Sequence, residues 1–226
     1  MTYIRNSEAQ DVRGQFVDLD GERYYKISNV DAMAPFFISV VSASNHWLFI
    51  SSSGCLSAGR IRPENALFPY RSVDYIHENA ENTGSKAIVK VAQGTNASAC
   101  WEPFNLHHDG KFDVERNIYK NVTGDKIVFQ EVNYTLGLSY QYSWQTSDRF
   151  GFVRETEVAN LDSQPKYIEI IDGIQNVLPP EVPKTVMQTS SALVDAYKWN
   201  ERVDTLPLAL YSLYAKLSDR ADPAES

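Results

Sequence analysis

Long apolar runs, a secretion signal and an excess of positive charge are all missing from this 226-residue sequence. The longest apolar stretch, residues 34–42, is too short for the roughly 18 residues of a membrane-spanning helix, so we expect no membrane partner. Residues 1–14 have neither the apolar core nor the small-residue cleavage site of a secretion signal, which indicates a cytoplasmic protein. Basic residues number 21 against 29 acidic ones, and the net charge of −8 argues against nucleic-acid binding.

Cysteines and catalytic motifs are also scarce. Without a secretion signal, Cys55 and Cys100 are expected to be two buried thiols rather than a disulfide. His107, His108 and Asp109 are adjacent, and adjacent side chains seldom face one metal, so we expect no metal site. The sequence holds no G-x-S-x-G elbow, P-loop or G-x-G-x-x-G. We therefore predict no cofactor and name no catalytic residue.

Short segments rich in β-branched and aromatic residues are what the sequence does have. They are bounded by Asn, Asp, Ser and Gly, which favour turns, and no helical pattern separates them. The segments are residues 22–28, 36–42, 46–52, 55–60, 86–92, 112–120, 125–134, 137–145, 150–160 and 166–174. A strand about every ten residues predicts an all-β fold of antiparallel sheets packed as a sandwich.

One segment, residues 137–145, alternates cleanly between apolar and polar side chains. Leu138, Tyr140, Tyr142 and Trp144 share one face, and serine and glutamine occupy the other. This period of two predicts a strand with its aromatic face in the core.

The pattern changes toward the C-terminus. Three prolines in residues 178–183 predict an extended crossing segment, because proline cannot donate a ladder hydrogen bond. Residues 191–203 place apolar side chains at helical spacing and predict a helix. Residues 206–217 are apolar at almost every position and fit either a helix or a strand. We treat residues 1–226 as one domain.

The segment at residues 59–78 is the most unusual, being too irregular for a strand and too aromatic for a flexible loop. Guanidinium, carboxylate and amide groups beside an aromatic ring are suited to hold a polyhydroxylated ligand. The candidate sugar-binding residues of this segment are Arg60, Arg62, Glu64, Asn65 and Tyr70. The alternative is a structural loop whose arginine and glutamate side chains pair with each other.

Trp101 is the candidate aromatic platform, because it follows Cys100 in an apparent loop that also holds Glu102 and Asn105. Aromatic rings stack on sugar faces, but most tryptophans belong to a protein core. Mutating Arg62 to alanine is expected to weaken sugar binding without unfolding the domain.

Several stretches together resemble a known family. These are YYKISNVDAMAPFFISVVSASNHWLFISSSGCLSAGR, PENALFPY, WEPF, NVTGDKIVFQEVN and LGLSYQYSW. Over roughly residues 14–226 the chain resembles the N-terminal part of bacterial proteins similar to cellobiose phosphorylase. The resemblance implies a β-supersandwich like that of galactose mutarotase, followed in the family by a helical barrel that carries the catalytic carboxylate.

The barrel has no counterpart in this sequence, so no catalytic residue is carried over. We expect a non-catalytic, carbohydrate-associated domain of a glycoside phosphorylase-like or hydrolase-like protein. It would shape a sugar site or an oligomer interface, with a C-terminal catalytic domain as its missing partner. The apolar residues 206–217 would promote a homodimer. The alternatives are a mutarotase-like or epimerase-like enzyme using a histidine and a glutamate, and a purely structural interaction domain.

Overall fold

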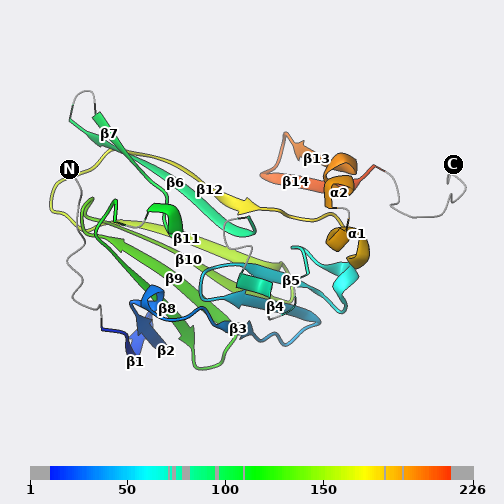
Figure 1. Ribbon diagram of the computed structural model, residues 1–226, viewed down its shortest axis with the longest axis horizontal. Helices are drawn as coiled ribbons and strands as arrows, with labels where there is room; N and C mark the ends of the chain where they lie inside the picture. The colour runs from blue at the N-terminus through cyan, green and yellow to red at the C-terminus, as the bar shows by residue number, and fades with distance from the viewer. Residues whose placement is uncertain are drawn as a thin grey trace, which may run out of the picture.

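The computed structural model describes residues 11–70, 72, 75–77, 82–94, 97–108, 110–180, 182–189 and 191–214. Within these residues the chain forms antiparallel β-sheets, with two short helices near the C-terminal end (Figure 1). The expectation of an all-β sandwich is confirmed. Of the unusual segment at 59–78, residues 71, 73, 74 and 78 lie outside the described part, and so does the side chain of His108.

The largest sheet has six strands in the order β1-β2-β8-β9-β10-β11. The strands are β1 (Arg13–Leu19), β2 (Glu22–Ser28), β8 (Val114–Asn121), β9 (Lys126–Asn133), β10 (Leu138–Ser147) and β11 (Gly151–Asn160). Strands β8 to β11 form a meander, because each is hydrogen-bonded to the next along the chain. Close turns at Gly124 and Gly151, both with positive φ, connect two of these strand pairs.

Two three-stranded sheets lie over one face of the large sheet (Figure 1). One consists of β3 (Phe37–Val40), β4 (His46–Ser51) and β5 (Leu56–Arg60), and the other of β12 (Ile168–Gln175), β6 (Gly84–Gln93) and β7 (Ala97–Trp101). Single 3-10 turns stand between strands at η1 (Val30–Ala32), η2 (Pro63–Asn65) and η4 (Leu106–His108). The chain thus forms two layers, with the core between them.

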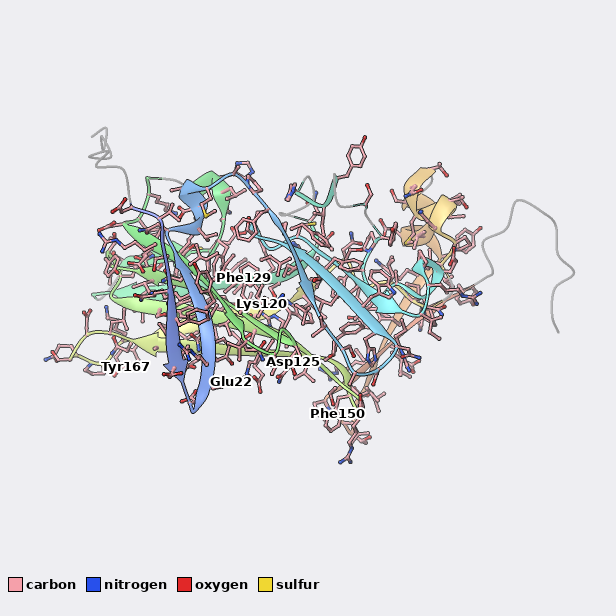
Figure 2. The ribbon with its side chains drawn as sticks, turned by 90° about the horizontal axis from the view of Figure 1, so that it is seen from below. Glu22, Lys120, Asp125, Phe129, Phe150 and Tyr167 are labelled. Atoms are coloured by element: carbon pink, nitrogen blue, oxygen red, sulfur yellow. The ribbon has the colours of Figure 1, made fainter. Side chains whose placement is uncertain are left out.

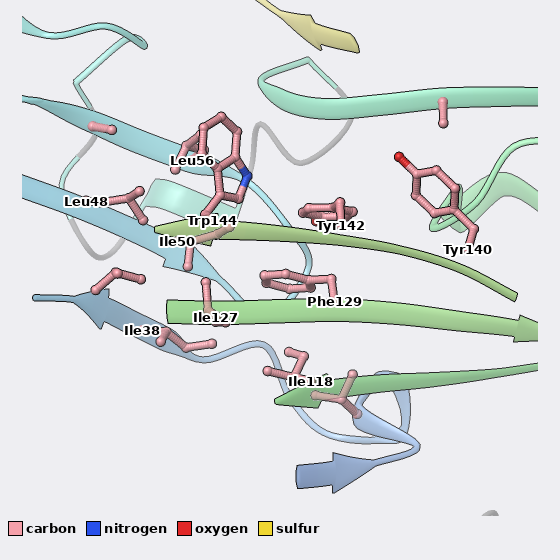
Figure 3. Close-up of a cluster of buried hydrophobic side chains, with 14 of the residues drawn as sticks. Ile38, Leu48, Ile50, Leu56, Ile118, Ile127, Phe129, Tyr140, Tyr142 and Trp144 are labelled. Atoms are coloured by element: carbon pink, nitrogen blue, oxygen red, sulfur yellow. The ribbon is translucent and has the colours of Figure 1, made fainter. Parts of the chain in front are cut away.

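The core is built from side chains of all three sheets (Figure 3). The aromatic face expected for residues 137–145 does point inward, and Tyr142 stacks on Phe129 of β9 with ring centroids 5.0 Å apart. Trp144 meets Phe68 edge-on at 5.9 Å. Aromatic pairs at these separations add to the free energy gained by burial alone.

A buried carboxylate, Glu131, lies in the middle of this core. It accepts hydrogen bonds from Trp101 Nε1 and from the backbone N–H of Phe104, both at 2.7 Å, and from Arg116 Nε at 2.9 Å. A buried charge is tolerated where it is paired and its lone pairs are used. Glu131 therefore ties β7, β8 and β9 together across the two layers.

The C-terminal region departs from the sequence expectation. Helix α1 (Lys184–Thr189) is followed by α2 (Ser191–Tyr197), and the helix predicted to reach residue 203 ends at Tyr197. The next residues form β13 (Lys198–Val203), which pairs with β14 (Leu208–Leu213) as a hairpin. Residues 198–203 have only a weak helical pattern. The backbone hydrogen bonds gained by pairing with β14 therefore favour the strand.

The proline-rich segment crosses from β12 to α1 as expected, and Leu178 N–H donates to the carbonyl of Leu67 at 2.8 Å. Leu178 and Val182 belong to a second, smaller apolar cluster, which includes α1 and α2 and which Leu213 contacts from the hairpin. The second cluster thus anchors the hairpin to the sandwich.

Other expectations need correction. Trp101 lies on strand β7 rather than in a loop, and β1 carried no recognised signal in the sequence. Cys55 is buried as expected, but Cys100 is exposed, and the two cysteines form no disulfide with each other. In the part of the chain that the structure describes, no helix has the length and apolar character needed to cross a membrane.

Candidate functional site

A groove of about 800 Å³ opens at one end of the sandwich, between strands β4 and β5 and the β10–β11 turn. The polar and aromatic groups in its lining are His46, Arg60, Asn65, Asp148, Arg149, Phe150 and Phe152. Grooves of this size accommodate small ligands, and a few placed polar groups within an apolar wall give them specificity.

The β10–β11 turn supplies one wall of the groove. Ser147 Oγ accepts hydrogen bonds from the backbone N–H groups of Arg149 and Phe150, both at 3.3 Å, and this fixes the turn. Phe150 is 69% exposed, and Figure 2 shows it at the tip of the turn, away from the core. The Arg149 guanidinium lies 5.0 Å from the centre of the Phe150 ring. The turn therefore presents an exposed aromatic ring with a cation over one of its faces.

Strands β4 and β5 supply the opposite wall, where His46 and Arg60 are paired across the two strands. Arg60 Nε donates to Asn45 Oδ1 at 3.1 Å, which orients the guanidinium. The His46 ring meets Phe152 edge-on at 5.1 Å, and its Nδ1 atom is buried with no hydrogen-bond partner in the structure.

The loop after β5 folds back onto its own strand, because position 59 has no side chain. Gly59 forms an isolated bridge with Ala66, and a Cβ atom at Gly59 would lie 2.5 Å from Trp47 Cζ2. Ile61 takes a left-handed φ of 61°, held by its N–H bond to the Asn45 carbonyl at 2.9 Å. A β-branched residue in this region costs about 1–3 kcal/mol, and such strain concentrates at functional sites.

The structure separates the predicted loop residues into three groups. Arg60 and Asn65 line the groove. Arg62 and Glu64 are exposed on the same loop but do not line it. Tyr70 packs instead in the second apolar cluster, with its ring near Lys184 Nζ at 4.6 Å.

Trp101 is not placed to act as the aromatic platform that the sequence predicts. The side chain is 1% exposed, and its Nε1 is used by the Glu131 carboxylate. Its ring is part of the core and offers no open face to a ligand, so Trp101 is a structural residue of this fold.

Sequence reasoning missed the β10–β11 turn as part of the candidate site. An exposed phenylalanine beside an arginine in a turn is an unusual combination, and the sequence sets Arg149 next to Phe150 without showing that the ring is exposed. His46 begins the predicted strand at residues 46–52, but nothing in the sequence places it near Asp148.

A second groove, of about 460 Å³, lies on the outer face of the large sheet. Its amides are bonded to neighbouring side chains: Tyr119 Oη donates to Gln130 Oε1 at 2.8 Å, and Gln141 Nε2 donates to Glu157 Oε2 at 2.8 Å. Burial, together with the nearby Glu115 carboxylate, raises the pKa of Tyr119 to about 12, so its hydroxyl stays protonated and donating. The groove at the β10–β11 turn is the better candidate for a functional site because the exposed Phe150 ring lines it.

Comparison of the chain with models of known protein families and with curated proteins finds no match. Within the described residues, no group of three or more His, Cys, Asp and Glu side chains is arranged to hold a metal ion. The groove itself is therefore the feature of the chain that bears on function.

Proposed function

We propose that the chain is a non-catalytic, carbohydrate-binding β-sandwich domain that holds a sugar in the groove at the β10–β11 turn. The observation that carries the proposal is the open Phe150 ring, set opposite the hydrogen-bonding groups of β4 and β5 in one groove. A sugar has an apolar C–H face and a rim of hydroxyls, and this groove offers a surface for each.

The two kinds of contact have separate roles. The Phe150 ring covers the apolar face of a pyranose, which removes apolar surface from water. Arg60, Asn65 and Arg149 donate to hydroxyl oxygens, and Asp148 accepts from hydroxyl protons. Because Arg60 is already oriented by Asn45, little conformational entropy is lost when it binds.

The resemblance to cellobiose-phosphorylase-like proteins supports the same reading. In that setting the domain serves a larger cytoplasmic glycoside phosphorylase or hydrolase, whose C-terminal domain carries out the chemistry. The groove then shapes one side of a sugar site in that assembly.

The test is calorimetric titration of the purified chain with mono- and disaccharides, with and without phosphate, after a thermal-shift screen has chosen the ligand. Phe150→Ala and Arg60→Ala are expected to weaken binding at least tenfold, a loss of about 1.4 kcal/mol each. The matched controls are Phe16→Ala, an exposed phenylalanine on β1, and Arg62→Ala, which lies just outside the groove lining. Both controls are expected to bind like the unmodified chain.

Absence of binding by any saccharide in the panel would refute the proposal for the isolated chain. If Arg62→Ala lowered affinity while Arg60→Ala did not, the sugar would lie along the outer side of the loop, as the sequence predicts for Arg62, and not in the groove.

A second candidate, a mutarotase-like enzyme, is favoured by one observation: His46 and Asp148 line the same groove. An imidazole and a carboxylate are the acid–base groups that ring opening of a sugar needs. Polarimetry of freshly dissolved glucose or galactose tests it. The non-catalytic proposal expects no acceleration, whereas an acceleration lost in His46→Ala would establish the enzyme.

A further inference from the structure

Strand β12 has one paired edge and one open edge. In its sheet the order is β12-β6-β7, and among the described strands only β6 is hydrogen-bonded to β12. The carbonyl of Tyr167 accepts from Ala92 N–H on the β6 side at 3.0 Å. Since backbone groups alternate along a strand, those of Ile168, Ile170, Asp172 and Ile174 point to the open edge.

The open edge is also apolar on both faces. Ile171 is 74% exposed on the outer face, next to its exposed cross-strand partner Ile88. Ile168, Ile170 and Ile174 point to the inner face and are nevertheless exposed. Strand β12 contains no proline or lysine to block pairing, and an apolar edge of this kind invites another strand.

We propose that this edge is a homodimer interface, in which β12 pairs antiparallel with β12 of a second copy about a two-fold axis at Ile171. The β12-β6-β7 sheet of one copy then joins the β12-β6-β7 sheet of the other copy into one continuous sheet across the axis. The unpaired backbone groups of the open edge are satisfied by the same groups of the other copy, as an isologous interface requires.

The register follows from the side chains. With the axis at Ile171, this residue faces the partner's Ile171, Ile168 faces the partner's Ile174, and Glu169 faces the partner's Gly173. A shift that centres the pair on Glu169 or on Asp172 sets two carboxylates directly opposite each other, which is unfavourable. Centring on Ile170 sets each Ile171 against a glutamate. The Ile171 register is the one that sets the exposed Ile171 against its own counterpart and also sets Ile168 against the partner's Ile174, with no like charges facing each other.

Charge does not oppose this pairing, although the chain carries a net charge of −8. Both acidic side chains of β12 are compensated within their own chain: Glu169 by Lys90 at 2.8 Å and Asp172 by Arg154 at 2.7 Å. On the outer face, Ile88 and Ile171 of each copy form one apolar stripe across four strands. Tyr167 and the inner isoleucines, all of them exposed, add further apolar surface to this edge.

The first test is the oligomeric state by sedimentation equilibrium. The unmodified chain is expected to be a dimer, and Ile171→Lys a monomer, because the change sets two ammonium groups against each other at the axis. Ile171 is exposed, so the variant retains its core, which far-ultraviolet circular dichroism checks. The matched control is Leu210→Lys, an exposed leucine of the β13–β14 hairpin, which is expected to remain a dimer.

A cysteine cross-link tests the register itself. In a Cys100→Ser background, which removes the one exposed native thiol of the described residues, Ile171→Cys is expected to form an intermolecular disulfide on mild oxidation. The backbone groups of residue 171 point toward β6, so residue 171 and the partner's residue 171 form a non-hydrogen-bonded pair. The two Cα atoms of such a pair are about 4.5 Å apart, which is within reach of a disulfide. Ile170→Cys faces the partner's Asp172 and is expected to remain reduced.

Three results would overturn the proposal. They are a monomeric unmodified chain at every concentration tested, a dimer that Leu210→Lys dissociates while Ile171→Lys does not, and cross-linking through position 170 in preference to 171. The second would assign the interface to the hairpin, where the apolar residues 206–217 predict it from sequence.

Discussion

The sandwich and the C-terminal hairpin use apolar residues in opposite ways. In the sandwich, Leu48 is 1% exposed and packs among aromatic and branched side chains from three sheets. In the hairpin, Leu210 is 50% exposed, and Trp199, Leu208 and Tyr214 on the same face are exposed as well. A similar composition therefore gives a closed core in one region and an open apolar face in the other.

This difference indicates which of the two regions contributes more to the free energy of unfolding. A two-stranded hairpin is marginal by itself, and this one is fixed to the rest of the chain through Leu213 and the second apolar cluster. The sandwich has a layered core and a satisfied buried charge at Glu131. Substitutions in the two regions should accordingly differ by several kcal/mol in their effect on unfolding.

The largest effect is expected for Glu131→Ala. The change leaves the buried Arg116 guanidinium without its main partner and removes the acceptor of Trp101, so the free energy of unfolding should fall by about 3–5 kcal/mol. Urea denaturation followed by tryptophan fluorescence measures it. The control is Glu155→Ala, an exposed glutamate 3.3 Å from Lys126, with an expected change within about 0.5 kcal/mol. Equal losses in the two variants would contradict a structural role for the Glu131 network.

Leu48→Ala comes next, with an expected loss of about 2–5 kcal/mol from lost burial and the cavity left behind. The same denaturation experiment measures it. A loss below about 1 kcal/mol would mean that the core around β4 collapses to fill the space.

A smaller, pH-dependent effect is expected for Asp172→Asn. Burial alone would raise the pKa of Asp172, but hydrogen bonds from Arg154 and Tyr140 outweigh it and hold this pKa below the usual range. The contact therefore stabilises the fold above the unfolded-state pKa near ~4 and is lost as the pH falls through the lower folded-state pKa. At pH 7 the variant should lose about 1.5–3 kcal/mol.

The pH comparison sharpens that result. As the pH is lowered from 6, the free energy of unfolding of the unmodified chain should fall more steeply than that of Asp172→Asn. The variant has no carboxylate to protonate at this position. Parallel pH profiles from thermal unfolding would show that Asp172 contributes nothing to acid sensitivity.

The smallest effect is expected for Leu210→Ala, the counterpart of Leu48→Ala in the hairpin. Because half of this side chain is already in water, its truncation should change the free energy of unfolding by at most about 0.5–1 kcal/mol. A loss as large as that of Leu48→Ala would show that the hairpin face is buried in solution, against another molecule or another part of the protein.

Most of the sheet strands could be predicted from the sequence, because alternation and turn residues are local signals. Residues 137–145 show this best, since one face is aromatic and the other polar. Strand β7 was missed because Ala97–Trp101 has little alternation of its own and is recruited by pairing with β6. Residues 198–203 were assigned to a helix because the pairing with β14 that makes them a strand depends on the turn between the two segments.

The candidate site was predictable only in part. Arg60 and Asn65 belong to a loop whose composition is unusual in the sequence, and both line the groove. Phe150 and Asp148 lie about ninety residues further along the chain, and only the sheet packing brings their turn against β4 and β5. Trp101 was assigned a surface role because the sequence does not reveal that its indole N–H meets a buried glutamate.

By itself, then, the sequence determined the class of fold and the inward face of its central strands, because strand periodicity and turn chemistry act over a few residues. The tertiary structure decided which polar residues share a groove, that Trp101 is buried, and which strand edge stays open. These depend on contacts between segments that lie 15 to 104 positions apart, such as Arg60 with Asn45 and Ser44 with Asp148. No local pattern encodes them, since they form only when the layers pack.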